Sequence, residues 1–119
     1  PGISEFSHSV DAEYTLKNYL DYRDKRKFQK CCDYYTAGFK KRFIRSFGNT
    51  CPDWFRESEM DFKESRIVGS KRGNLNRFTV ESTIDDPTAN AIYAKVTEHY
   101  DLIVEKGEWK IDNWSIEYK

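Results

Sequence analysis

The chain has 119 residues, of which 34% are charged and 16% are aromatic, and its 20 basic residues balance its 20 acidic residues. A chain of about 100–150 residues is typical of a single domain. The aromatic content excludes a disordered chain, and the charge balance argues against a dedicated nucleic-acid binder, which usually carries a basic excess. The sequence contains no run of roughly 20 apolar residues, the length that a membrane-spanning helix needs.

Residues 1–7 (PGISEFS) show no periodicity, and we interpret them as a linker added for expression. Residues 8–119 then form one domain. The natural protein is expected to be longer, and a membrane anchor or signal sequence would lie in the part that was removed. Contact with a membrane is expected only through such a segment.

The first half of the domain has the periodicity of short helices. Ser9 is a predicted N-cap, and apolar residues at helical spacing continue to the charged run Arg23–Lys27, where we predict the helix to end. No residue of this run is expected to be buried. A second short helix follows, with Phe28, Cys31, Cys32 and Tyr35 on one face.

Two further helices are predicted before the chain changes period. Thr36–Phe47 carries phenylalanines four residues apart, with Thr36 as its N-cap. Gly48-Asn49 ends this helix, because both residues tolerate positive φ. Asp53 to about Phe62 forms the next helix, with Pro52 at its start, where proline is accepted.

From Glu64 the period changes to that of β-strands. Glu64–Gly69 and Arg77–Ile84 are predicted strands, and a longer strand runs from Ile92 to a turn at Lys106-Gly107. In the last strand the apolar positions change from odd to even numbers at Asp112-Asn113. Such a slip predicts a β-bulge, because without one the apolar residues would lie on both faces.

Helices followed by strands are typical of the α+β class. We therefore predict an α+β domain in which the N-terminal helices pack on one face of a curved antiparallel sheet of about four strands. Its core is expected to consist of a few large rings, since the chain contains 8 Tyr, 8 Phe and 3 Trp.

Two segments, Phe28–Phe39 (FQKCCDYYTAGF) and Tyr100–Asp112 (YDLIVEKGEWKID), together with the order of the elements, resemble the nuclear transport factor 2-like superfamily. The resemblance implies a cone-like domain in which the helix-facing side of the sheet lines a pocket. This superfamily includes ketosteroid isomerase-like enzymes, transport adaptors, lipoproteins and extracytoplasmic domains of bacterial conjugation channels. A shared fold leaves the function open.

Glu98 is the charged member of an otherwise apolar row of one strand face, which consists of Ile92, Ala94, Val96, Tyr100, Leu102 and Val104. In an open pocket its pKa would be raised and it would serve as a general base, with Tyr100 or Tyr14 as the donor to a developing enolate. The alternative is a structural carboxylate paired with a Lys or Arg of a helix, or one near the rim.

The opposite sheet face is the candidate interaction surface. Tyr93 and His99 lie on this face, with Trp109 or Trp114 nearby, depending on the bulge. Large rings on an exposed face indicate a protein-binding surface, and the resemblance implies self-association through this face. Cross-strand pairs that shield the backbone are the structural alternative.

Cys31, Cys32 and Cys51 allow one disulfide, from Cys51 to Cys32 or to Cys31, or three free thiols. Their spacing matches no zinc motif, so we expect no metal. The chain also lacks a phosphate-binding glycine loop and a Ser/His/Asp set, so no cofactor is expected. The basic groups around Lys40–Arg45 and Lys71–Arg77 are interpreted as solvated surface.

These observations favour a non-enzymatic protein-interaction domain, the soluble extracytoplasmic part of a membrane-anchored bacterial protein such as a component of a conjugation (type IV secretion) channel. A cytoplasmic location stays open. The alternative is a small-molecule-binding or ketosteroid isomerase-like domain that uses Glu98.

Overall fold

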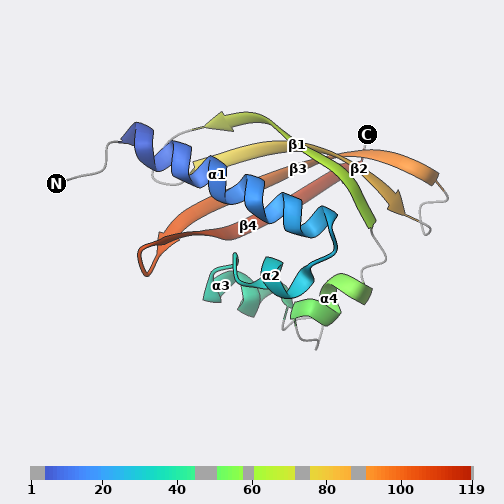
Figure 1. Cartoon of the computed structure of the whole chain (residues 1–119), viewed down its shortest axis with the longest axis horizontal. Helices are drawn as coiled ribbons and strands as arrows, with labels where there is room; N and C mark the ends of the chain where they lie inside the picture. The colour runs from blue at the N-terminus through green and yellow to red at the C-terminus, as the bar shows by residue number, and fades with distance from the viewer. Residues whose placement is uncertain (1–4, 45–50, 58–60, 72–75, 87–90, 119) are drawn as a thin grey trace.

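The computed structural model describes residues 5–44, 51–57, 61–71, 76–86 and 91–118. Helices come first along the chain and one antiparallel sheet follows, so the predicted α+β class is confirmed (Figure 1). The elements are α1 (Glu5–Asp24), α2 (Phe28–Cys32), α3 (Ala37–Phe39), a π-helical turn (Lys40–Ile44), α4 (Cys51–Glu57), β1 (Asp61–Lys71), β2 (Asn76–Asp86), β3 (Ala91–Glu105) and β4 (Glu108–Tyr118).

The four strands pair in chain order, each antiparallel to the next. β1 and β4 are the two edges of the sheet and do not pair with each other, so the sheet is open and the cone-like shape stays a prediction. The helices lie on one side of the sheet, with α1 running along it and the shorter helices gathered below (Figure 1). We call the helix-covered side the inner face and the other side the outer face.

One side of α1 faces the sheet. Its buried residues, Ala12, Leu16, Tyr19, Leu20 and Arg23, recur at spacings of three and four, which aligns them on one helix face. The helix begins at Glu5, so the predicted start at Ser9 is wrong, and part of the segment that we interpreted as a linker is helical.

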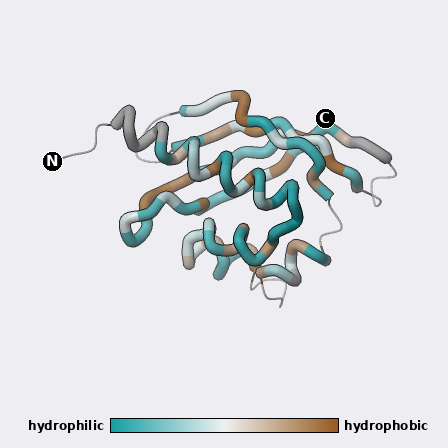
Figure 2. The backbone as a smooth tube through the Cα atoms, in the orientation of Figure 1, coloured by the Kyte–Doolittle hydropathy of each residue, from teal (hydrophilic) through white to brown (hydrophobic). Residues whose placement is uncertain are grey.

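The end of α1 and the turn after it are hydrophilic (Figure 2). The helix ends at Asp24, as predicted, and Arg26 takes a positive φ of 60° in the turn. The expectation that nothing in this run is buried is wrong, however, because Arg23 is only 3% exposed. Arg23 is the last sheet-facing residue of α1, so its guanidinium lies between the helix and the inner face of the sheet.

The middle of the chain follows the predicted elements in part. Phe28, Cys31 and Cys32 of α2 are buried, and Thr36 caps α3 by accepting a hydrogen bond from the N–H of Phe39 at 2.9 Å. The expected stop at Gly48-Asn49 lies outside the described residues. Phe62 belongs to β1 and not to the preceding helix, as α4 ends earlier than predicted.

A β-bulge lies in β4, as predicted. Asp101 pairs with Asn113 and Leu102 with Ile111, which leaves Asp112 as the extra residue. The carboxylate of Asp112 accepts a hydrogen bond from the hydroxyl of Thr36 at 2.8 Å, so the bulge connects the helical segment to the sheet.

The segment around Tyr35 also closes part of the β4 edge. Tyr35 forms an isolated parallel bridge with Ile111. The N–H of Thr36 donates to the carbonyl of Ile111 at 3.0 Å, and the N–H of Ile111 donates to the carbonyl of Tyr34 at 2.7 Å. The backbone of β4 is therefore already paired on both sides at this point.

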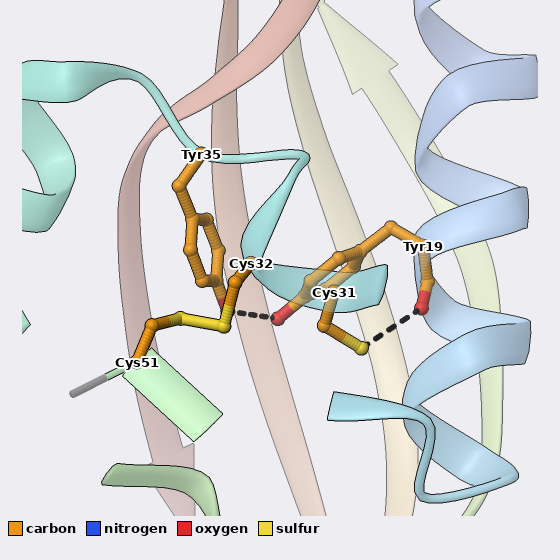
Figure 3. The surroundings of a disulfide bond; sticks show 5 residues. All are labelled: Tyr19, Cys31, Cys32, Tyr35 and Cys51. Atoms are coloured by element: carbon orange, nitrogen blue, oxygen red, sulfur yellow. Dashed lines mark hydrogen bonds between the residues drawn. A yellow bond between two sulfur atoms is a disulfide. The ribbon is translucent and has the colours of Figure 1, made fainter. Parts of the chain in front are cut away.

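Aromatic rings dominate the inner core, as expected. Phe28 stacks on Phe55 with 4.9 Å between ring centroids, and Tyr35 stacks on Phe39 at 4.4 Å. A disulfide between Cys32 and Cys51, with Cα atoms 6.0 Å apart, joins α2 to α4 beside these rings (Figure 3).

The third cysteine, Cys31, is a buried free thiol whose side chain points toward Tyr19 of α1 and away from the disulfide (Figure 3). Its sulfur lies 4.0 Å from the carbonyl oxygen of Tyr19. Burial raises the pKa of the Cys31 thiol to about 12, so the thiol stays protonated and unreactive at neutral pH.

Candidate functional site: a buried arginine–glutamate cluster

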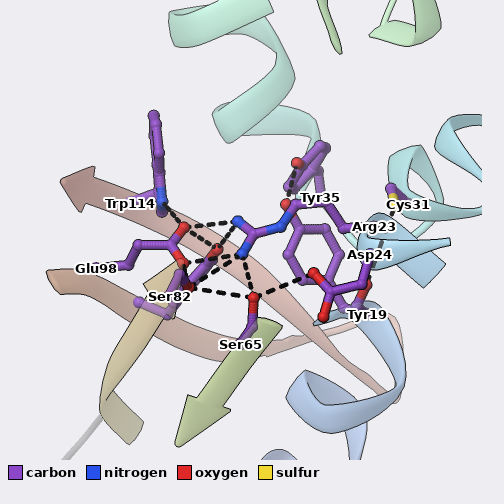
Figure 4. Close-up of polar contacts among 10 residues, drawn as sticks. Tyr19, Arg23, Asp24, Cys31, Tyr35, Ser65, Ser82, Glu98 and Trp114 are labelled. Atoms are coloured by element: carbon purple, nitrogen blue, oxygen red, sulfur yellow. Dashed lines mark hydrogen bonds and ion pairs between the residues drawn. The ribbon is translucent and has the colours of Figure 1, made fainter. Parts of the chain in front are cut away.

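The inner face of the sheet contains a buried ion pair between Arg23, in the last turn of α1, and Glu98, in the middle of β3 (Figure 4). The pair is bidentate. Nη1 of Arg23 lies 2.6 Å from Oε1 of Glu98, and Nη2 lies 2.9 Å from Oε2. The planar guanidinium thus matches both oxygens of the carboxylate.

Three further donors reach the Glu98 carboxylate. The hydroxyl of Tyr100 and the indole N–H of Trp114 donate to Oε1 at 2.7 and 2.9 Å, and the hydroxyl of Ser82 donates to Oε2 at 2.5 Å. A carboxylate has about four lone-pair positions, and five donor contacts occupy them. Glu98 is completely buried, so this network replaces all its contact with water.

The charge state of Glu98 follows from these contacts. Burial alone would raise the pKa of Glu98, but the charge of Arg23 and the hydrogen bonds from Arg23, Ser82 and Tyr100 outweigh burial and hold the pKa below its ordinary value. For Arg23, burial lowers the pKa, while the charge of Glu98 raises it well above the ordinary value. Both side chains are therefore charged at neutral pH.

The guanidinium of Arg23 has its own surroundings. Nη2 donates to the hydroxyl of Ser65 at 2.9 Å, and Ser65 in turn donates to the carboxylate of Asp24 at 3.1 Å. The guanidinium carbon lies 3.4 Å from the centroid of the Phe62 ring, a cation–π contact. The buried Nε of Arg23 has no hydrogen-bond partner within the described part of the chain.

These contacts leave Glu98 unsuited to proton abstraction. A general base needs an oxygen that faces the substrate, and both oxygens of Glu98 face fixed donors. The hydroxyl of Tyr100 donates to Glu98, so it is not directed at a ligand, and burial raises its pKa well above the ordinary value. Hollows of about 450 to 820 Å³ in the described surface are lined by neither Glu98 nor Tyr100, although Ser65 and Ser82 line the one of about 820 Å³.

Tyr14, the other predicted pocket donor, is not near this cluster. Its side chain is 66% exposed. Tyr14 is two residues from both Ala12 and Leu16, which places it on the opposite side of α1 from the sheet. The prediction that Tyr14 lines a pocket is therefore wrong.

The predicted interaction residues are divided between the two faces of the sheet. The bulge puts both Trp109 and Trp114 on the inner face, where each packs against the core, so neither contributes a ring to the outer face. His99 is on the outer face, exposed, and pairs with Thr79 and Ser115 on the neighbouring strands. The side chain of Tyr93 lies outside the described residues.

The alternative in which Glu98 is a structural carboxylate paired with a Lys or Arg of a helix is confirmed, but the sequence did not single out Arg23 as that partner. Two signals were present: Arg23 continues the inward spacing of Leu16, Tyr19 and Leu20 on α1, and Ser82 is a polar residue in an otherwise apolar row of β2. Polar residues at inward positions of different elements indicate a buried network when they can satisfy each other.

The described residues hold no group of three His, Cys, Asp or Glu side chains placed to bind a metal ion. Among the helices of the described ranges, none is long and apolar enough to cross a membrane.

Comparison with known proteins supports the fold alone. No family model matches the chain, and no curated protein matches it significantly. The chain is similar to the solution structure of a SEC-C motif-containing protein from Rhodopseudomonas palustris, with a TM-score of 0.65 and 14% identity over 90% of this chain and 79% of that protein. At this identity the likeness extends to the arrangement of helices and sheet.

Proposed function

We propose that the chain is a non-enzymatic protein-interaction domain of the nuclear transport factor 2-like type. One observation carries the proposal: Glu98, the buried carboxylate among the described residues, is held by Arg23 and three further donors. An interior of this kind stabilises one structure and offers no reactive group to a small molecule. The surface is then the part of the domain that acts.

The compartment in this proposal is extracytoplasmic. The Cys32–Cys51 disulfide supports it, because such bonds persist in oxidising compartments and are rare in the cytosol. Membrane attachment would come from a segment outside this sequence. Within this class we favour a component of a bacterial conjugation (type IV secretion) channel, on the resemblance of Phe28–Phe39 and Tyr100–Asp112.

The alternative, an isomerase-like enzyme, is less well supported. It needs a free base and a free acidic donor that face one open pocket. Glu98 and Tyr100 do converge, but on each other and on Arg23. A substrate would have to displace a bidentate ion pair before reaction.

An isomerisation assay tests the absence of catalysis. The purified domain is incubated with β,γ-unsaturated ketones, and the conjugated product is followed by ultraviolet absorbance. We expect no rate above the buffer background. A rate that the wild type shows and Glu98→Gln loses would overturn the proposal.

Three further measurements test the interaction role and the compartment. Trapping of thiols in intact cells is expected to show Cys32 and Cys51 oxidised. Deletion of the gene in its own host is expected to lower the frequency of plasmid transfer, and complementation to restore it. Unchanged transfer would remove the conjugation hypothesis, while light scattering of the purified domain decides whether it associates with itself.

A further inference from the structure

A hollow of about 520 Å³ lies between α1, the turn after α2 and the start of β4. Three aromatic side chains line it, Tyr22 from α1, Tyr34 from the turn and Trp109 from β4, together with charged residues that include Lys30, Asp33 and Lys110. The volume is within the usual range of about 300–1,000 Å³ for binding sites.

The three rings are held in place by the core behind them. Tyr22, Tyr34 and Trp109 are half-buried and all pack against the inner core. Tyr34 meets Tyr19 edge-on with 6.0 Å between centroids, and Tyr22 lies 6.1 Å from Tyr34. Tyr and Trp rings fixed in a hollow bind with little loss of side-chain entropy, which is why they are common anchors in protein interfaces.

The charges around the rings cancel. Lys30 and Lys110 are opposed by Asp33 and Glu108. Lys110 donates to the carbonyl of Asp33 and pairs with the Glu108 carboxylate at 3.2 Å, and the Lys30 ammonium lies 5.1 Å from the Tyr22 ring. The hollow therefore lacks the group of uncompensated arginines with which domains bind phosphorylated or acidic peptides.

Two other modes of peptide binding also fit poorly here. Addition of a strand needs a free strand edge, and the edge of β4 at Ile111 already pairs with Tyr34 and Thr36. A bound helix is about 10–12 Å wide and needs an apolar groove, whereas four charged side chains border this hollow. The remaining mode is the binding of an extended peptide through contacts with the faces of the aromatic rings.

We propose that this aromatic hollow, formed by Tyr22, Tyr34 and Trp109, binds a proline-rich segment of a protein partner in the polyproline II conformation. The inference rests on the proposed function as an interaction domain. Polyproline II chains have unpaired carbonyls and a backbone that is already ordered. Aromatic-lined grooves bind them through ring contacts with proline, without main-chain pairing.

The test is a titration of isotope-labelled protein with 12-residue peptides that contain Pro-x-x-Pro, with x as Ala, Leu or Arg, followed by NMR. The chain has 3 Trp and therefore three indole N–H signals. We expect the Trp109 signal to move while those of Trp54 and Trp114 stay in place. Absence of any shift at Trp109 with every peptide at millimolar concentration overturns the inference.

Variants sharpen the result. Trp109→Ala and Tyr34→Ala are expected to weaken peptide binding about tenfold or more, as for interface anchors. Tyr14→Ala, on the far side of α1, and His99→Ala, on the outer sheet face, are matched controls that should leave the affinity unchanged. Because Trp109→Ala also removes core contacts, its fold is checked by circular dichroism, and the shift pattern of the wild type stands independently of it.

Control peptides decide between the modes. A scrambled peptide without proline and an amphipathic helical peptide should both fail to move the Trp109 signal, and a stronger response to either one overturns the inference. The proposed function has a separate readout: if a purified partner binds the domain equally well with Trp109→Ala, the interaction role stands and the hollow is the wrong surface.

Discussion

Trp54 of α4 meets Trp114 of β4 edge-on, with ring centroids 6.2 Å apart and the ring planes at 90°. The indole N–H of Trp114 points into the core and donates a hydrogen bond to Glu98. The disulfide-linked helix therefore covers a tryptophan that belongs to the buried ion-pair network. Trp114 bonds directly to Glu98, whereas Trp54 contacts Trp114, so substitutions at the two positions can separate their roles.

Trp114→Phe keeps most of the ring and removes the donor. A hydrogen bond to a buried charged group contributes about 1.5–3 kcal/mol, so we expect the free energy of unfolding to fall by about that amount. Trp54→Phe is the matched control, because it keeps an aromatic contact with Trp114 and leaves Glu98 fully bonded. Equal losses for the two variants in urea unfolding would contradict a special role for the Trp114 indole.

We expect the Arg23–Glu98 ion pair to be costly to break, because one charge is then left buried and unpaired, but to add little net stability compared with an uncharged pair. Arg23→Met leaves Glu98 buried without its counter-charge, which costs about 3–5 kcal/mol. The double variant Arg23→Met/Glu98→Gln removes both charges and keeps an amide oxygen as an acceptor for the buried donors around position 98, so we expect it to recover part of this loss. Urea unfolding of both single variants and the double variant measures the coupling.

Lys25→Ala is the control for that cycle. Lys25 forms an exposed pair with Asp21 at 3.0 Å, and such pairs contribute about 0–1 kcal/mol. If Arg23→Met cost no more than Lys25→Ala, the buried network would not hold α1 on the sheet.

Acid is expected to weaken the domain through Glu98. The folded state holds the pKa of Glu98 below its ordinary value of 4.5. A lowered pKa means that the folded state binds protons less readily than the unfolded state, so this contribution is complete above about pH 4.5 and decreases as the pH falls through the folded-state pKa.

The measurement compares wild type with Glu98→Gln by urea unfolding between neutral pH and pH 3. The stability of the wild type should decline more steeply in the acid range, because the variant has no titrating group at this position. Parallel curves would show that the Glu98 carboxylate does not lose its proton more readily in the folded protein.

Sequence reasoning identified local features and missed a distant one. Glu98 and the Asp112 bulge were found because both interrupt a regular alternation within a single strand. Arg23 was not singled out because its partner is 75 residues away and the residues 25–27 that follow it in the same charged run are exposed. In a run of charged residues, a buried position is recognised only when the helical spacing of the buried residues is extended to the last turn of the helix.

The sheet face on which Trp109 and Trp114 lie could be assigned only from the pairing register of β4. The phase slip in β4 predicted a bulge, and the paired residues show that the extra residue is Asp112. That single residue keeps Trp109 and Trp114 on the same face, and Trp109 therefore lines the hollow beside α1. The sequence left the disulfide partner of Cys51 open, because Cys31 and Cys32 are adjacent and their directions depend on the orientation of α2.

The choice between these cysteines is testable by reduction. The Cys32–Cys51 bond spans a sequence separation of 19 residues, and closing a loop of this size stabilises a protein by about 3 kcal/mol. We expect dithiothreitol to lower the melting temperature of the wild type, and Cys32→Ser to be low-melting and insensitive to dithiothreitol. Cys31→Ala is the matched control, since it should keep the response to reduction although it loses a buried sulfur. If Cys31→Ala abolished that response and Cys32→Ser kept it, Cys51 would be bonded to Cys31, and α2 would have to be rotated from its position in this structure.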